Sequence, residues 1–152
     1  MKFGPIVIGK DGGKDSTVDG VMFEIKSLFT IGVLRFAPGT REAFHSHAFN
    51  CWSIVLKGGL REEFLDPRRN VRWHREGDTV TTYRTDVHQV KAVEETFVLT
   101  FRGPWADTWR DVVETFKGSN TYFVDTLTHG RKLLDSAWCG DRATAAEVAA
   151  RP

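Results

Sequence analysis

The chain of 152 residues lacks the features that mark secreted, membrane-spanning and nucleic-acid-binding proteins. It has only two cysteines, Cys51 and Cys139, so we expect no disulfide framework and a reducing, cytoplasmic location. Its formal net charge of +1 argues against a partner held by charge, such as nucleic acid or an anionic membrane. No apolar run approaches the roughly 20 residues that span a bilayer, and residues 1–10 have too short an apolar core for a signal peptide.

Helical periodicity is also missing from most of the chain. No 3.6-residue repeat of apolar positions occurs before residue 104. Instead, β-branched and aromatic residues gather in segments of about five to eight residues at roughly ten-residue spacing, separated by turn residues. This pattern predicts an all-β antiparallel sandwich or barrel. The expected strands are 6–8, 21–25, 29–36, 44–56, 60–65, 71–75, 80–83, 87–93 and 96–102.

The sequence after Pro104 is less regular. Residues 109–116 and 121–127 flank a turn and suggest a closing hairpin. Asp141 is a plausible N-cap for a short helix rich in Ala and Glu over 141–150. We find no internal repeat and no domain boundary, so residues 1–152 are expected to form one domain with a core of about 21–127.

Two histidines, His45 and His47, follow the turn at Pro38-Gly39. Side chains two positions apart in a strand share a face, so both imidazoles can aim at one point, as ligands of a metal ion must. Alone, such a pair is more often two ordinary surface histidines than a metal site. His74 and His129 stand beside turns and are expected to be solvated.

The segment around the histidine pair resembles the first motif of the cupin superfamily. That motif reads Gly, five residues, His-x-His, three or four residues, Glu, six residues, Gly. Here Gly39 is followed by five residues and then by His45 and His47, and Gly58 and Gly59 fall where the motif closes. The glutamate of the motif falls on Cys51 or Trp52, so this carboxylate is missing.

A second segment resembles the second cupin motif, which reads Gly, five residues, Pro-x-Gly, two residues, His, three residues, Asn. Gly77 and His88 have its spacing, whereas residues 83–85 replace Pro-x-Gly and Ala92 replaces the asparagine. The resemblance spans about residues 30–103.

The resemblance implies a cupin double-stranded β-helix, a jelly-roll barrel with a short C-terminal hairpin and helix. In it, His45, His47 and His88 would bind one metal ion. A site of three neutral imidazoles leaves the metal more positive than a site with a carboxylate. Its open positions then favour anionic ligands such as a thiolate, a carboxylate or superoxide.

One cupin branch with three histidines, the thiol dioxygenases related to cysteine dioxygenase, is similar in more detail. It has a cysteine soon after His-x-His, then an apolar strand, then Gly-Asn-Leu-Lys-Glu. Here Cys51 leads through an apolar strand to Gly-Gly-Leu-Arg-Glu at 58–62. The outer Ser-His-Tyr set of that branch is absent, because its positions fall near Phe97, Leu99 and Phe101.

Five further residues are candidates for the pocket. Cys51 stands near the position of the missing carboxylate and Tyr83 at a position of the second motif, so both are catalytic candidates. Arg35, Arg102 and Trp105 are candidates for substrate binding. The arginines are candidates because an anionic substrate needs a cation, and Trp105 because its ring can line the mouth of the barrel. Each has an ordinary alternative: a small buried thiol, a plain strand residue, surface arginines and a ring that covers the barrel.

The leading hypothesis is a mononuclear non-haem Fe(II) dioxygenase acting on a small anionic substrate, a thiol among the candidates. Zn, Mn or Ni are the alternative metals. The alternative functions are a non-catalytic cupin binding or structural module, and a metal-dependent isomerase, lyase or decarboxylase on the same barrel. The expected partners are a small-molecule substrate, dioxygen and a second copy of the chain in a homodimer, without nucleic acid or membrane.

Overall fold

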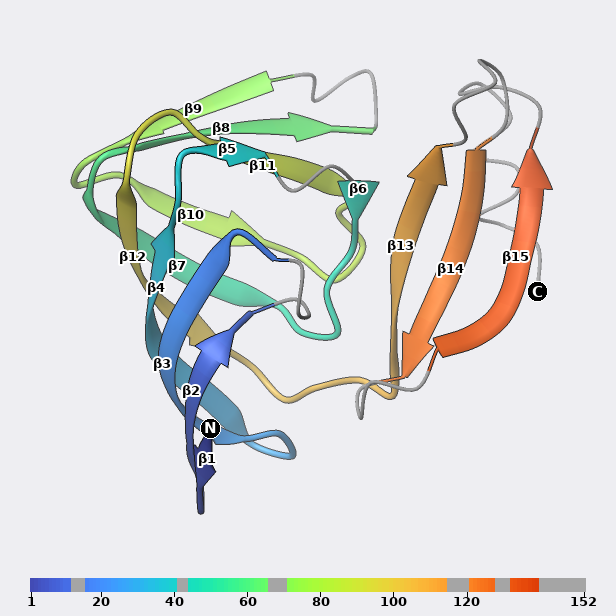
Figure 1. Cartoon of the computed structure of the whole chain (residues 1–152), viewed down its shortest axis with the longest axis horizontal. Coiled ribbons are helices and arrows are strands. Elements are labelled where there is room, and N and C mark those ends of the chain that lie inside the picture. Colours follow the sequence, from blue (N-terminus) through green and yellow to red (C-terminus); the bar gives the residue numbers. More distant parts are fainter. Residues whose placement is uncertain (12–15, 41–43, 66–70, 115–120, 128–131, 140–152) are drawn as a thin grey trace.

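The computed structural model describes residues 1–11, 16–40, 44–65, 71–114, 121–127 and 132–139. Every regular element in these ranges is a β-strand, so the predicted all-β fold is confirmed (Figure 1). The helix predicted over 141–150 lies outside the described residues. No helix able to cross a membrane occurs in the described ranges.

The strands form two antiparallel sheets that face each other as a jelly-roll barrel (Figure 1). The seven-stranded sheet has the order β1-β2-β3-β4-β12-β7-β10 and contains β1 (Lys2–Phe3), β2 (Ile6–Lys10), β3 (Val18–Ile25), β4 (Phe29–Phe36), β12 (Thr96–Arg102), β7 (Cys51–Lys57) and β10 (Thr79–Thr82). The eight-stranded sheet has the order β15-β14-β13-β6-β11-β8-β9, with β5 paired to β11, and contains β5 (Gly39–Thr40), β6 (Phe44–His45), β8 (Gly59–Phe64), β9 (Val71–Arg75), β11 (His88–Ala92), β13 (Thr108–Glu114), β14 (Thr121–Leu127) and β15 (Lys132–Cys139).

The expected strand over 44–56 is divided into β6 and β7. The backbone between them leaves the ladder because it bonds to other loops: Ala48 O accepts from Ala106 N at 2.6 Å, and Asn50 O accepts from Gly103 N at 2.9 Å. His47 therefore lies in a loop, and the prediction that both histidines share one strand was wrong.

The C-terminal hairpin is confirmed as β13 paired with β14. A further strand that the sequence did not predict, β15, pairs with β14. The hairpin joins the barrel through β6, where Asp111 pairs with His45 and Val112 with Phe44. One edge of β6, the strand that contains His45, is thereby paired with β13.

The core lies at one end of the barrel, between the two sheets. Leu34, Val98 and Val55 are neighbours across β4, β12 and β7, and all point inward. The opposite sheet contributes Leu60 and Ala92, which pack with Val98. Val55 is fully buried, which contributes about 1.5–3 kcal/mol.

Two glycine turns, at Gly58 and Gly77, connect strands of this core. Both adopt φ +87°, a left-handed conformation that other residues rarely take. At Gly58 a Cβ would lie 2.5 Å from Thr96 Oγ1, whereas at Gly77 it would meet nothing within 4 Å. Thr96 cannot move aside easily, because its hydroxyl accepts from Gly59 N and donates to Gly59 O, both at 3.0 Å.

Replacing each glycine with alanine separates backbone strain from steric clash. We expect Gly77→Ala to lower the free energy of unfolding by about 1 kcal/mol, from backbone strain alone. Gly58→Ala adds a clash with a buried hydroxyl and should cost about 2–4 kcal/mol. Urea unfolding of the two variants beside the parent measures both values, and equal losses would contradict the close approach at Gly58.

Candidate metal centre

Three histidines converge at the end of the barrel away from this core. His45 ends β6, His47 follows in the loop and His88 begins β11. The three rings lie with their centroids 5.0 Å apart in every pair. One ligand nitrogen of each falls within 4.8 Å of the others, so the group can hold a metal ion.

The pairing of β11 creates this convergence. The segment with the first motif lies along β11, with Gly39 opposite Ala92 and His45 opposite His88. Gly39, which begins β5, adopts φ +125°, a backbone conformation that favours glycine. Residues far apart in the sequence are thus brought together by the register of one strand.

The nitrogens that face each other are suitable ligand atoms. Nε2 of His47 and Nε2 of His88 are 2.8 Å apart. Two imidazoles on one divalent ion, each at about 2.1 Å from it, hold their nitrogens about 3 Å apart or slightly more. A small outward shift of the rings would therefore admit an ion. His45 and His88 are buried, and His47 is half-buried.

A buried carboxylate, that of Glu62, lies behind His88. Its Oε1 is 2.5 Å from His88 Nδ1, and its Oε2 is 2.8 Å from His74 Nε2. Burial alone would raise the pKa of Glu62, but the hydrogen bonds of His74 and His88 outweigh it and hold the pKa at about 2. Because an ionised carboxylate only accepts hydrogen bonds, both imidazoles donate to it.

Sequence reasoning missed this group. His74 was expected to be solvated, which was wrong: its side chain is 11% exposed and contacts Glu62. The signal lay in β8, where Leu60, Glu62 and Phe64 share the inward face. A carboxylate between two apolar residues on a buried face must be paired. His129 lies outside the described residues.

The opposite wall carries a polar row across the seven-stranded sheet. Thr30, Arg102, Cys51 and Thr82 are successive neighbours across β4, β12, β7 and β10. Beside this row, Ser53 Oγ donates to Thr100 Oγ1 at 3.0 Å. The inner face thus changes from apolar at the core to polar at the end that faces the histidines.

Arg102, a predicted substrate-binding residue, points into this end of the barrel and is 5% exposed. Its Nη1 and Nη2 bond to Asp11 at 3.1 and 2.5 Å, while its buried Nε has no partner within the described ranges. The guanidinium carbon lies 4.7 Å from the ring centroid of Phe49, and that ring lies 5.2 Å from the ring of His47. One aromatic ring therefore separates this cation from the histidines.

Cys51 is half-buried and neighbours Arg102 across the strands. Burial raises the pKa of its thiol, while a hydrogen bond with Thr82 and the charge of Arg102 partly oppose this. The group at neutral pH is accordingly a thiol rather than a thiolate. It does not belong to the metal-binding group found among the described residues.

The three remaining predicted site residues differ in where they lie. Trp105 is half-buried, its ring 5.0 Å from that of Phe49, with its Nε1 3.4 Å from Thr30 Oγ1. Arg35 is exposed on the outer face of β4 and pairs with Glu95 at 2.5 Å. Tyr83 is 52% exposed. The structure brings Trp105 towards the site and leaves Arg35 and Tyr83 at the surface.

No protein-family model and no curated protein matches this chain. Several solved structures resemble it, each with 16% identity. An RmlC-like cupin from Shewanella frigidimarina covers 68% of this chain and 88% of its own, with a TM-score of 0.51. The match to a sugar phosphate isomerase from a cupin superfamily, from Silicibacter pomeroyi, covers 82% of this chain and 76% of that protein, with a TM-score of 0.52.

Oxalate decarboxylase from Bacillus subtilis, described with Mn(II) centres, matches 69% of this chain at 16% identity and a TM-score of 0.52. The match spans only 29% of that enzyme. These likenesses establish that the chain has the cupin fold, as the two sequence motifs predicted.

Removing one ligand tests the cluster directly. We expect the purified protein to bind close to one equivalent of a divalent metal, and His88→Ala to weaken its affinity by at least about 100-fold. Lys91→Ala, an exposed position on the same strand, should leave the affinity unchanged. Elemental analysis and competition with a metal-binding dye give both values. A folded protein that takes up no metal would contradict the site.

Proposed function

We propose that this protein is a mononuclear Fe(II)-dependent dioxygenase that acts on a small anionic substrate, with a thiol as the first candidate. His45, His47 and His88 would hold the metal. The observation that carries the proposal is a group of three histidines, without a carboxylate among them, with a buried arginine one aromatic ring away.

The donor set fits a divalent transition metal. Imidazole nitrogen binds Fe, Zn, Ni and Cu well, and three ligands on one side leave open positions on the other. When bound, Fe(II) would supply an electrophilic centre at which substrate and dioxygen are brought together. The Mn(II) centres described for oxalate decarboxylase support a divalent metal in a barrel of this fold.

The charge of the site supports an anionic substrate. Three neutral imidazoles leave the charge of the ion uncompensated, so a thiolate or carboxylate is favoured at the open positions. Across the barrel, Asp11 holds two nitrogens of the Arg102 guanidinium, and the buried Nε–H remains to donate to an anion. Phe49 and Trp105, in ring contact with each other, would exclude water beside them.

A dioxygenase reaction on a thiol needs no further reductant. A thiol RSH and O₂ combine to give the sulfinic acid RSO₂H, in which both oxygen atoms are bound to sulfur. The sulfur supplies all the electrons that reduce dioxygen. This balance suits a site in which three histidines could hold a metal and Arg102 could donate to an anion.

Oxygen uptake tests this function. The Fe(II)-loaded protein, prepared without air, is mixed with a panel of small thiols that carry a carboxylate or an amine. We expect one thiol to change the iron spectrum and, in air, to consume one O₂ per sulfinate formed, measured by electrode and mass spectrometry.

The alternatives predict other results. A metal-dependent isomerase, lyase or decarboxylase would turn over sugar phosphates or small carboxylic acids without oxygen. A binding or structural module would turn over nothing. A metal-loaded protein that responds to no thiol in spectrum or oxygen uptake would remove the dioxygenase function while leaving the metal site.

The two arginines predicted for substrate binding form a matched pair for mutation. Arg102→Met should raise KM for the anionic substrate by about 10- to 100-fold, because a hydrogen bond to a charged group contributes about 1.5–3 kcal/mol. Arg35→Met removes an exposed arginine with its own acidic partner and should leave KM unchanged. Circular dichroism confirms folding before KM is measured, and equal KM values in both variants would exclude Arg102 as the anion donor.

A further inference from the structure

We propose that Glu62 and His74 are positioning residues that fix which nitrogen of His88 faces the metal. This inference rests on the proposed metal centre and assigns a role to two residues outside its ligand set. The chain from His74 through Glu62 to His88 crosses three adjacent strands, β9, β8 and β11.

The geometry leaves one tautomer of His88 favourable. Its Nδ1 faces an oxygen of Glu62, so this nitrogen must carry the proton. The Nε2 of His88 then carries the free electron pair that can bind a metal, and it points towards His47. In the opposite tautomer two lone pairs would face each other in a buried place. The carboxylate thus selects Nε2 as the ligand atom before any metal binds.

His74 fixes the carboxylate in turn. It stands opposite Leu60 in the β8–β9 register, and its Nε2 bonds to the second oxygen of Glu62. With both oxygens held from opposite sides, the carboxylate plane cannot rotate away from His88. The partner of a ligating histidine commonly changes metal affinity by about 10- to 100-fold.

Glu62→Gln tests the role with little change in shape. The amide can accept only through its oxygen, so it cannot hold both imidazoles as donors. We expect nitrogen NMR of the metal-free variant to show the histidine signals of a mixed tautomer at His88, and metal affinity to fall by about 10- to 100-fold. His74→Asn should also lower the metal affinity, but by a smaller factor than Glu62→Gln.

The control is Glu63→Gln, the neighbouring acid on β8, whose carboxylate accepts from Arg61 at 3.0 Å. It should change neither the His88 tautomer nor the affinity. Urea unfolding is measured for all variants, so that a loss of stability is not mistaken for a loss of positioning.

The outcomes separate this inference from the metal site. If the parent binds metal and Glu62→Gln binds it equally well with an unchanged tautomer, the positioning role is excluded. If the parent binds no metal, the proposed function fails, while the tautomer of the metal-free protein still supports or contradicts the role of Glu62.

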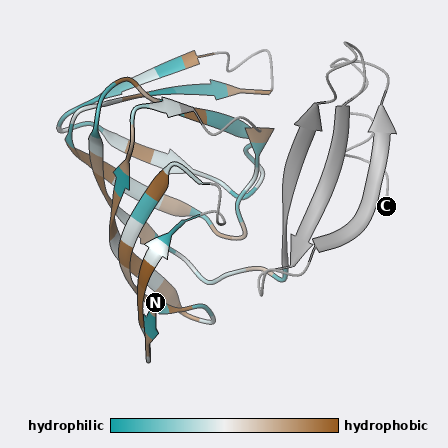
Figure 2. Ribbon diagram, in the orientation of Figure 1, coloured by the Kyte–Doolittle hydropathy of each residue, from teal (hydrophilic) through white to brown (hydrophobic). Residues whose placement is uncertain are grey.

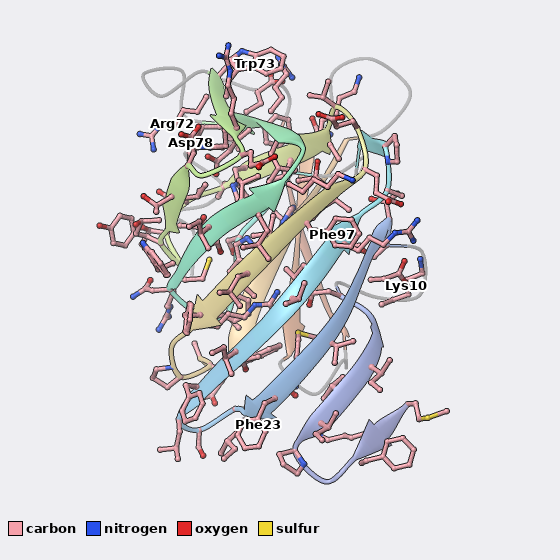
Figure 3. All side chains as sticks on the ribbon, turned by 90° about the vertical axis from the view of Figure 1, so that its left-hand side faces the viewer. Lys10, Phe23, Arg72, Trp73, Asp78 and Phe97 are labelled. Carbon is pink, nitrogen blue, oxygen red and sulfur yellow. The ribbon has the colours of Figure 1, made fainter. Side chains whose placement is uncertain are left out.

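Apolar residues occur along the strands of the seven-stranded sheet (Figure 2), and some of them, Phe23 among them, are exposed on its outer face (Figure 3). Ile8, Val21 and Val33 are neighbours across β2, β3 and β4, and they are 42%, 55% and 40% exposed. On the same face, Phe23 pairs with Ile31 across β3 and β4, and Phe101 pairs with Trp52 across β12 and β7.

Discussion

The site depends on the register of a single strand, β11. On one side β11 pairs with β5 and β6, which sets His88 opposite His45; on the other it pairs with β8, which carries Glu62. Side chains alternate along a strand, so a shift of one residue would turn His88 out of the barrel and leave Glu62 buried without its partner. The positions of His88, Glu62 and Ala92 relative to their neighbours therefore all follow from the alignment of one strand.

Much of the fold was predictable because it is local. Alternation of apolar residues and turn glycines predicted most strands of the barrel, whereas the third histidine, His88, was identified by the resemblance to the second cupin motif. The division of strand 44–56 was not predictable, since it depends on bonds from Ala48 and Asn50 to loops far along the chain. The facing of Arg35 and Arg102 was likewise open until strand pairing fixed it.

Both buried charges of the site are paired, as burial requires. Glu62 lies between two imidazoles, and Arg102 is held by Asp11. The two buried charged groups, Glu62 and Arg102, belong to opposite sheets, with the histidines and Phe49 between them. This arrangement fixes the charged groups in position, and Nε2 of His47 and Nε2 of His88 face each other between them.

The missing carboxylate of the first motif acquires a physical meaning from this arrangement. Where a ligand carboxylate would cancel part of the charge of a metal ion, this chain has Cys51, a thiol across the barrel. Its buried carboxylate, Glu62, is instead one hydrogen bond behind a ligand. There it can fix the orientation of the His88 ring without occupying a coordination position. The ion would keep both its positive charge and its open positions, which is what binding an anion and dioxygen together requires.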